Sequence, residues 1–218
     1  MTLIRPFAGL RPVAGRAEDV VAPPYDVLNS AEARTRAAGR PWSFLHISKA
    51  EIDLPEGTDP HADEVYARAA SNLRSMLQEG VLVRDPQPCY YIYRLVMGDH
   101  RQTGLVAAAS VAAYDSNRIR KHEFTRPDKE DDRVRQIEAL QAQTGPVLLA
   151  YESRPEVDAL LEAVTARDPD VDLVADDGIG HTLWAVSERA VIEQISSAFD
   201  ACLLYTSDAA DDRRGVLF

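Results

Sequence analysis

The densest group of side chains able to do chemistry lies between Lys121 and Arg133, where the sequence reads KHEFTRPDKEDDR. Ten of these thirteen residues are ionisable. Cations beside the start of a helix, where backbone N–H groups also face outward, suit a phosphate or carboxylate group. The pattern therefore predicts an anion site. Its cations are Lys121, Arg126, Lys129 and Arg133.

Two neighbours of these cations, His122 and Glu123, have side chains that can move a proton as general acid or base. The same segment also has a purely structural interpretation. Pro127 suits the first turn of a helix, and the acidic residues that follow it favour the positive end of the helix dipole. Both interpretations, a solvated helix start and a ligand site, remain open at this point.

A second feature is the segment Val21 to Val27, VAPPYDV. Its two prolines fix the backbone and so hold Tyr25 and Asp26 in a defined position at low entropic cost. Such a rigid presentation suits a substrate contact, and it suits the packing of a loop equally well. Tyr25 and Asp26 are therefore candidate substrate-binding residues.

His46 is a third candidate, because histidine can bind ligands and transfer protons. It stands between Leu45 and Ile47 in WSFLHIS, a run whose aromatic and branched residues predict a strand over 42–48. A histidine in that setting is more often hydrogen-bonded in the core or at a sheet edge than part of a site.

The elements expected to position these residues alternate between helices and strands, with hairpins, which predicts an α+β fold with a largely antiparallel sheet. The first 29 residues are predicted to be extended. A sub-boundary is expected near 115–120. The predicted helices cover 31–38, 59 to about 79, a segment carrying Val134, Ile137 and Leu140, 156–166 and 188–199. The other predicted strands cover 89–97, 103–114, 147–151, 171–175 and 182–186.

The composition limits the function classes. With 35 acidic against 24 basic side chains, the net charge is -11, which disfavours general binding to nucleic acid or to anionic membranes. The N-terminus lacks a signal-like apolar core, and the longest apolar run, Leu105 to Ala113, is too short to span a bilayer. A soluble, cytoplasmic protein is expected. The oligomeric state is left open.

Familiar catalytic signatures are missing from the sequence. It contains no Walker loop, no dinucleotide glycine fingerprint, no HExxH and no serine elbow. The two cysteines, Cys89 and Cys202, match no metal-binding spacing and indicate no disulfide framework. The sequence thus predicts no metal site of its own.

The end of the chain is unusual. From Cys202 it reads CLLYTSDAADD, which resembles the translation of a transposase-based sequencing adapter. Residues 202–218 are therefore expected to be a non-native tail, and 1–201 the N-terminal portion of a domain.

Four motifs in order resemble the bacterial and archaeal domain-of-unknown-function family numbered 1015. They are IRPFAGLRP, VVAPPYDV, SFLHISKAEIDLPEGTDPHADEVY and RKHEFTRPDKEDDRVRQIEALQAQTGPVLLAYE. The resemblance implies a longer protein, with an ADGHHR-type motif beyond the point reached at Ala201. That motif is similar to the phosphate-contacting motif of the ParB-like superfamily, which includes a nucleotide-gated partition protein and free-serine kinases.

The resemblance thus implies a nucleotide or phosphorylated metabolite as ligand, with ATP or ADP and Mg²⁺ as expected cofactors. In a small-molecule phosphotransferase of this kind, the anion site would hold phosphate, His122 or Glu123 would be the base, and Tyr25, Asp26 and His46 would contact the substrate. Two alternatives stay open, a nucleotide-binding switch without turnover and a non-catalytic interaction scaffold. The isolated 1–201 portion is expected to expose apolar surface and to be inactive.

Overall fold

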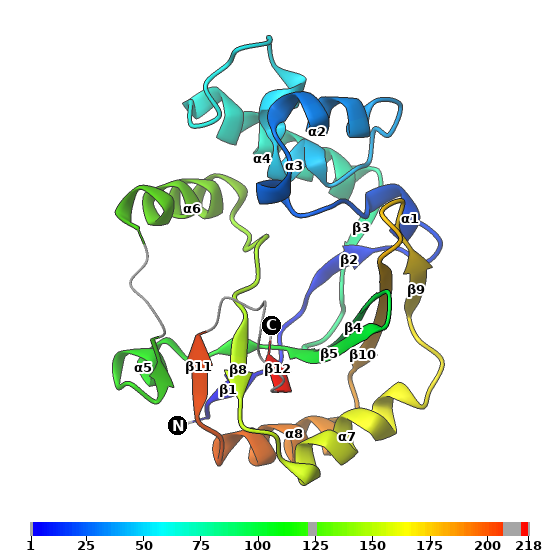
Figure 1. Cartoon of the computed structure of the whole chain (residues 1–218), viewed down its shortest axis with the longest axis vertical. Helices are drawn as coiled ribbons and strands as arrows, with labels where there is room; N and C mark the ends of the chain where they lie inside the picture. Colours follow the sequence, from blue (N-terminus) through cyan, green and yellow to red (C-terminus); the bar gives the residue numbers. More distant parts are fainter. Residues whose placement is uncertain (1, 122–125, 207–214, 218) are drawn as a thin grey trace. The chain divides into compact units, whose positions relative to one another are not determined.

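The structure is a computed structural model of the chain, and it describes residues 2–121, 126–206 and 215–217. The chain divides into two compact units, each made of segments that are distant in the sequence (Figure 1). Unit 1 contains residues 1–10, 84–124 and 146–218, and unit 2 contains residues 11–83 and 125–145. The helices and the mostly antiparallel strands confirm an α+β fold.

Unit 1 is built on an eight-stranded sheet with the order β7-β11-β8-β12-β5-β4-β10-β9. Its centre consists of long antiparallel strands, whereas β11 pairs with β7, and β12 with β5, in parallel. The strands are β4 (Tyr90–Met97), β5 (His100–Val106), β7 (Ile119–Arg120), β8 (Leu149–Tyr151), β9 (Val171–Val174), β10 (Gly180–Val186), β11 (Leu204–Thr206) and β12 (Gly215–Leu217). A separate pair joins β1 (Ile4–Arg5) to β6 (Ala108–Ala109).

Both predicted hairpins are confirmed. Gly98 between β4 and β5, and Gly178 between β9 and β10, adopt the positive φ that such tight turns require. The strand predicted over 103–114 is too long, because β5 ends at Val106 and α5 (Val111–Asp115) follows β6. The Ser110 hydroxyl accepts a hydrogen bond from Ala113 N–H, so it caps a helix that the apolar composition concealed.

The core of unit 1 lies between the sheet and two helices, α7 (Pro155–Thr165) and α8 (Arg189–Asp200). Alternate residues of the central strands, such as Ile92 and Trp184, face these helices. Phe199 of α8 is fully buried and packs edge-on against Tyr151 at 5.0 Å between ring centres. Both helices were predicted within two residues of their ends.

Unit 2 is mainly helical. Its elements are α1 (Ala17–Val20), the 3-10 turn η1 (Tyr25–Val27), α2 (Ser30–Ala37), α3 (Leu45–Ser48), the 3-10 turn η2 (Ala50–Asp53), α4 (Asp63–Gln78) and α6 (Pro127–Leu140). A two-stranded pair, β2 (Leu10–Pro12) with β3 (Leu82–Arg84), lies where the chain passes from one unit to the other.

The predicted helices of unit 2 are present with shifted ends. Asn29 caps α2, in a reciprocal capping box with Glu32. In α4, Val65, Ala69 and Leu73 are buried as the helical spacing predicts. On α6, Leu140 is buried but Val134 is 47% exposed, because α6 turns a more polar side toward α4.

The strand predicted over 42–48 is wrong. The segment instead forms a turn followed by the short helix α3, in which Leu45 and Ile47 are both buried. Leu45 packs with α2 and Ile47 packs with α4, so the two side chains belong to different hydrophobic clusters. Because β-propensity mostly reflects packing surroundings, helical neighbours override it here.

The segment expected to be a foreign tail supplies strands in the structure. Leu204–Thr206 pairs with β8 and β7, and Leu204 is fully buried. That outcome matches the high strand preference of Leu-Tyr-Thr and does not test the origin of these residues. The expected sub-boundary near 115–120 also stays a prediction. Within the described part of the chain, no helix is both long and apolar enough to cross a bilayer.

Candidate functional site

The structure brings together two residues that the sequence singled out separately, Tyr25 and Arg133. The guanidinium carbon of Arg133 lies 4.5 Å from the centre of the Tyr25 ring, a cation–π contact. On its other side, Arg133 Nη2 donates a hydrogen bond of 2.8 Å to Oδ2 of Asp132. The side chain keeps 34% of its surface exposed. Arg133 is thus held in place while about a third of its side chain faces solvent.

Local backbone chemistry explains how these two residues are presented. Pro24 precedes the 3-10 turn η1, which carries Tyr25 on a short rigid segment. Pro127 occupies the first turn of α6, where its missing N–H costs no helical hydrogen bond. Arg133 therefore projects from the second turn of a regular helix, and its direction is set by the helix axis.

Asp132 is the centre of a hydrogen-bond cluster between α4 and α6, both in unit 2. Its Oδ1 accepts bonds from Tyr66 Oη at 2.6 Å and from His61 Nδ1 at 3.0 Å, while Oδ2 accepts from Arg133. Burial by itself raises the pKa of the Asp132 carboxyl, but these three donors overcome it and lower that pKa to about 2. Asp132 is therefore a fixed carboxylate at neutral pH.

Arg135 reinforces the same cluster from the next turn of α6. Its guanidinium carbon lies 4.5 Å from the Tyr66 ring centre, and it forms an ion pair with Asp63. Its Nη1 also donates to the backbone carbonyl of His61 at 3.0 Å. Burial, followed by the hydrogen bond to Asp132, raises the pKa of Tyr66 to about 12, so its phenol stays a donor.

Two of the three remaining predicted cations, Arg126 and Lys129, lie at or near the start of α6. Lys129 and Arg133 are four residues apart, so they are neighbours on one side of α6, and Arg126 precedes Lys129 by one turn at the N-cap. Arg126 and Lys129 are exposed. Lys121 lies in unit 1, with its ammonium 4.4 Å from the Tyr114 ring centre. His122 and Glu123 fall outside the described residues.

Asp26 and His46 are placed differently. Asp26 is exposed on η1, next to Tyr25. His46 has both ring nitrogens engaged within unit 2, Nδ1 with Asp53 at 2.8 Å and Nε2 with the carbonyl of Arg40 at 3.1 Å. Asn72 donates to Asp53 and to the His46 carbonyl. The structure therefore gives His46 a set of internal partners apart from the Asp132 cluster.

Gln136 is a polar residue that the sequence analysis missed. It lies one turn after Asp132 on α6, and only 6% of its surface is exposed. Among the described residues, the buried side-chain nitrogen or oxygen atom that lacks a hydrogen-bond partner is Nε of Arg16, so the Gln136 amide is no evidence for a ligand.

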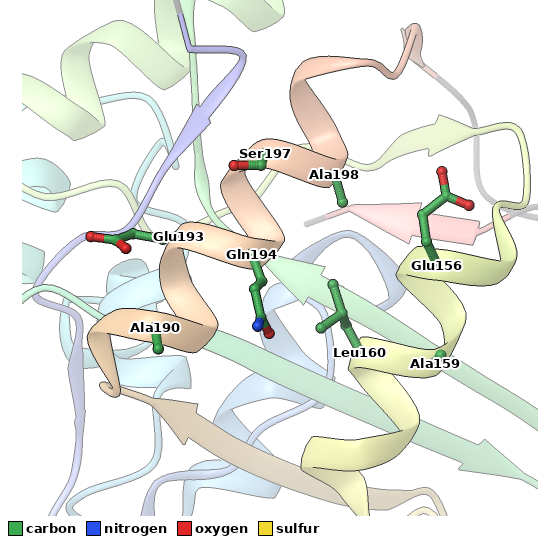
Figure 2. Close-up of a pocket in the computed structure, with 8 residues that line it drawn as sticks. All are labelled: Glu156, Ala159, Leu160, Ala190, Glu193, Gln194, Ser197 and Ala198. Atoms are coloured by element: carbon green, nitrogen blue, oxygen red, sulfur yellow. The ribbon is translucent and has the colours of Figure 1, made fainter.

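Each unit has a shallow groove. The groove of about 760 Å³ between α7 and α8 has Leu160 and small residues along it, and its charged lining residues are Glu156 and Glu193 (Figure 2). Those carboxylates disfavour an anionic ligand. The groove of about 560 Å³ between α4 and α6 adjoins the Asp132 cluster, and its charged lining is balanced, with Arg74 and Arg135 beside Asp63 and Glu138.

Among residues 2–121, 126–206 and 215–217, no group of three or more His, Cys, Asp or Glu side chains is arranged to hold a metal ion. In particular, the three contacts of Asp132 are hydrogen-bond donors, which occupy its oxygens.

Comparison with known proteins identifies the family. A family model described as "Protein of unknown function (DUF1015)" matches residues 4–208. The chain belongs to the DUF1015 family. No curated protein and no solved structure matches it. Family membership, expected from the four motifs, is confirmed, whereas the likeness to ParB-like proteins stays a prediction.

In this DUF1015 protein, sequence reasoning found Arg133 and Tyr25 but missed His61, Tyr66 and Asp132. Asp132 was interpreted only as an acid favouring the helix dipole. His61 and Tyr66 stand inside the third motif, DLPEGTDPHADEVY, which was used for the family resemblance alone. A usable signal was the helical spacing of that segment, because Tyr66 is next to the buried Val65 and therefore near the packed face of α4.

Proposed function

We propose that this DUF1015 protein binds a nucleotide and transfers a phosphoryl group between it and a hydroxylated small molecule. The observation that carries the proposal is the state of Arg133. Its guanidinium has five N–H donors, and within the described residues only Asp132 accepts a hydrogen bond from it. An arginine oriented in advance, with donors to spare, suits the planar recognition of phosphate oxygens.

The neighbouring cations extend this anion site. Lys129 and Arg126 lie along the same helix within two turns of Arg133, so they can contact further phosphate oxygens of a di- or triphosphate. Phosphoryl transfer depends mainly on positioning and on the stabilisation of charge on the transferred group, which arginine and lysine provide.

Tyr25 and Asp26 supply the remaining contacts of the proposed site. Tyr25 is 40% exposed and offers a ring edge and a hydroxyl, and Asp26 adds an exposed carboxylate beside it. Together these groups suit a polar metabolite with hydroxyl groups, positioned beside the bound phosphate.

ATP or ADP with Mg²⁺ is the proposed cofactor. Mg²⁺ commonly binds through substrate phosphates, one or two carboxylates and water, so a complete protein cage is not required. Asp26, beside Tyr25, is the exposed carboxylate best placed to contribute. His122 and Glu123 remain the bases that the sequence proposes.

A second candidate function, an interaction scaffold without a ligand, is favoured by one observation. Arg133 already has two internal partners, Tyr25 and Asp132, so it can be explained by the packing of unit 2 alone. The charge-reversing variant Lys129→Glu separates the two. Under the phosphotransferase proposal, this variant binds nucleotide more weakly than the wild type. Under the scaffold proposal, neither the wild type nor the variant binds nucleotide measurably.

The direct test is a transfer assay. Because the 1–201 portion by itself is expected to be inactive, a full-length member of the family with the same site residues is incubated with ATP or ADP, Mg²⁺ and a panel of hydroxylated metabolites including serine, and phosphorylated products are measured. The proposal predicts a product that depends on both nucleotide and metabolite. Nucleotide binding without any product would support the switch that resembles a partition protein, and the transferase proposal would then fail.

A further inference from the structure

We propose that His61, oriented by Asp132, accepts the proton of the hydroxyl group that is phosphorylated. The inference deepens the proposed phosphotransferase function and rests on it. It assigns the base to His61 in place of His122 or Glu123, the bases predicted from the sequence. The geometry behind it is a carboxylate–imidazole pair in which the carboxylate is fixed and the outer ring nitrogen is open to solvent.

The carboxylate partner is held firmly. The Asp132 side chain is only 13% exposed, whereas the His61 side chain is 53% exposed. Two donors besides His61 bind it, Tyr66 on Oδ1 and Arg133 on Oδ2. Because these bonds fix both oxygens, the direction in which Asp132 accepts from His61 Nδ1 is also fixed.

This contact determines which ring nitrogen carries the proton. An ionised carboxylate can only accept, so Nδ1 of His61 must be the donor, and the neutral ring then has a lone pair on Nε2. Within the described residues, no hydrogen bond to Nε2 is found. The free nitrogen lies on a half-exposed ring, which leaves it accessible to a substrate hydroxyl.

The backbone of His61 is tied down as well. Its N–H donates to Oδ1 of Asp59 at 2.9 Å, and its carbonyl accepts from Arg135 at 3.0 Å. The ring is thus preorganised at the entrance to α4, beside two arginines of α6.

In the proposed step, the oxygen of the substrate hydroxyl attacks the terminal phosphorus of the nucleotide. The proton of that hydroxyl passes to Nε2 of His61. A new P–O bond forms, and the bond to the leaving nucleotide oxygen breaks with its electron pair staying on that oxygen. The resulting imidazolium is stabilised by Asp132 and then releases its proton to water. Asp132 is a positioning residue, since it contacts the ring and not the substrate.

The first arm of the test does not need turnover. Nitrogen-15 NMR of the full chain, labelled in histidine, is expected to show His61 in the Nδ1–H form when neutral. Asp132→Asn should shift the ring toward the Nε2–H form, while the exposed His100 keeps its spectrum. A wild-type His61 with its proton on Nε2 would overturn the assignment.

The second arm measures transfer with the metabolite found in the assay above. His61→Gln is expected to lower kcat by about 10² to 10⁴-fold with little change in the KM for nucleotide, because a base acts on the chemical step. His100→Gln is the control. Free imidazole should partly restore His61→Ala, a result that misfolding cannot produce.

The outcomes separate the two proposals. A His61→Gln enzyme within tenfold of the wild-type rate would overturn the role of His61 and leave the phosphotransferase standing. Absence of transfer by the wild-type protein would overturn both. An inactive His61→Ala variant that melts cooperatively yet gains nothing from imidazole would also count against the base.

Discussion

Tyr25 and Arg133 come from distant parts of the sequence and meet with the guanidinium carbon 4.5 Å from the ring centre. The contact joins the proline-rich segment before η1 to the charged helix α6. The proline-rich segment was a candidate because its backbone is rigid, and α6 was a candidate because its charged residues are dense. Since the two segments are in contact, the simplest explanation is that both belong to one site.

The Tyr25–Arg133 contact should be measurable by itself. Tyr25→Ala should lower the free energy of unfolding, and in a double-mutant cycle with Arg133→Ala the coupling energy should be about 0.5–1 kcal/mol, the usual strength of an exposed cation–π pair. Tyr25→Phe keeps the ring and serves as control. Urea unfolding gives the values, and a coupling energy of zero would show that the two side chains do not interact in solution.

Asp132 predicts a specific pH dependence of stability. Its pKa is lowered in the folded protein to about 2 from 3.8, so its contribution is present above about pH 4 and is lost as the pH falls toward 2. Allowing for solvent screening, the contribution is about 1–2 kcal/mol. Asp132→Asn should flatten this part of the curve. An unchanged loss of stability between pH 4 and 2 in the variant would contradict the assignment.

Gly9 should not tolerate a side chain. A Cβ at this position would lie 2.7 Å from the hydroxyl of Tyr91, which also accepts a bond from Gly9 N–H and donates to Asp85. Gly9→Ala is expected to destabilise the protein by about 1–3 kcal/mol, as overpacking does in cores. Gly145→Ala, with open space around the added carbon, is the matched control. Equal midpoints in urea for the two variants would refute this packing.

His46 tests whether a predicted site residue is structural. Its ring contacts Asp53 and the Arg40 carbonyl, so His46→Leu should lower stability by about 1–3 kcal/mol by removing the donor to Oδ1 of Asp53, whose Oδ2 keeps only Asn72. Nucleotide affinity should stay within twofold of wild type. A large loss of affinity in a variant that unfolds at the wild-type midpoint would instead place His46 in the ligand site.

The sequence predicted those parts of the fold in which local signals and packing agree. The hairpin turns at Gly98 and Gly178 and the apolar spacing of α4 are examples. The segment 42–48 failed because its strand-like composition is overridden by burial of Leu45 and Ile47 against different helices. No local pattern reports that kind of tertiary preference.

The candidate site was predictable in part for a related reason. Arg133 and Tyr25 stand out by residue type, but the partnership of Asp132 with His61 and Tyr66 depends on how α4 and α6 pack. Helical spacing alone suggested Val134 as a packed residue, whereas the structure turns Asp132 and Gln136 inward. Polar contacts between helices distant in the sequence need the tertiary structure.

Isothermal titration of MgADP into three full-length proteins tests the central claim most directly. The proteins are the wild type, Arg133→Gln, and Arg189→Gln, which removes an exposed arginine paired with Glu193 on α8. The account predicts binding by the wild type, an affinity at least tenfold weaker without Arg133, as expected for losing a charged hydrogen bond, and no change without Arg189. Equal affinities for all three proteins, or no heat of binding from the wild type, would contradict it.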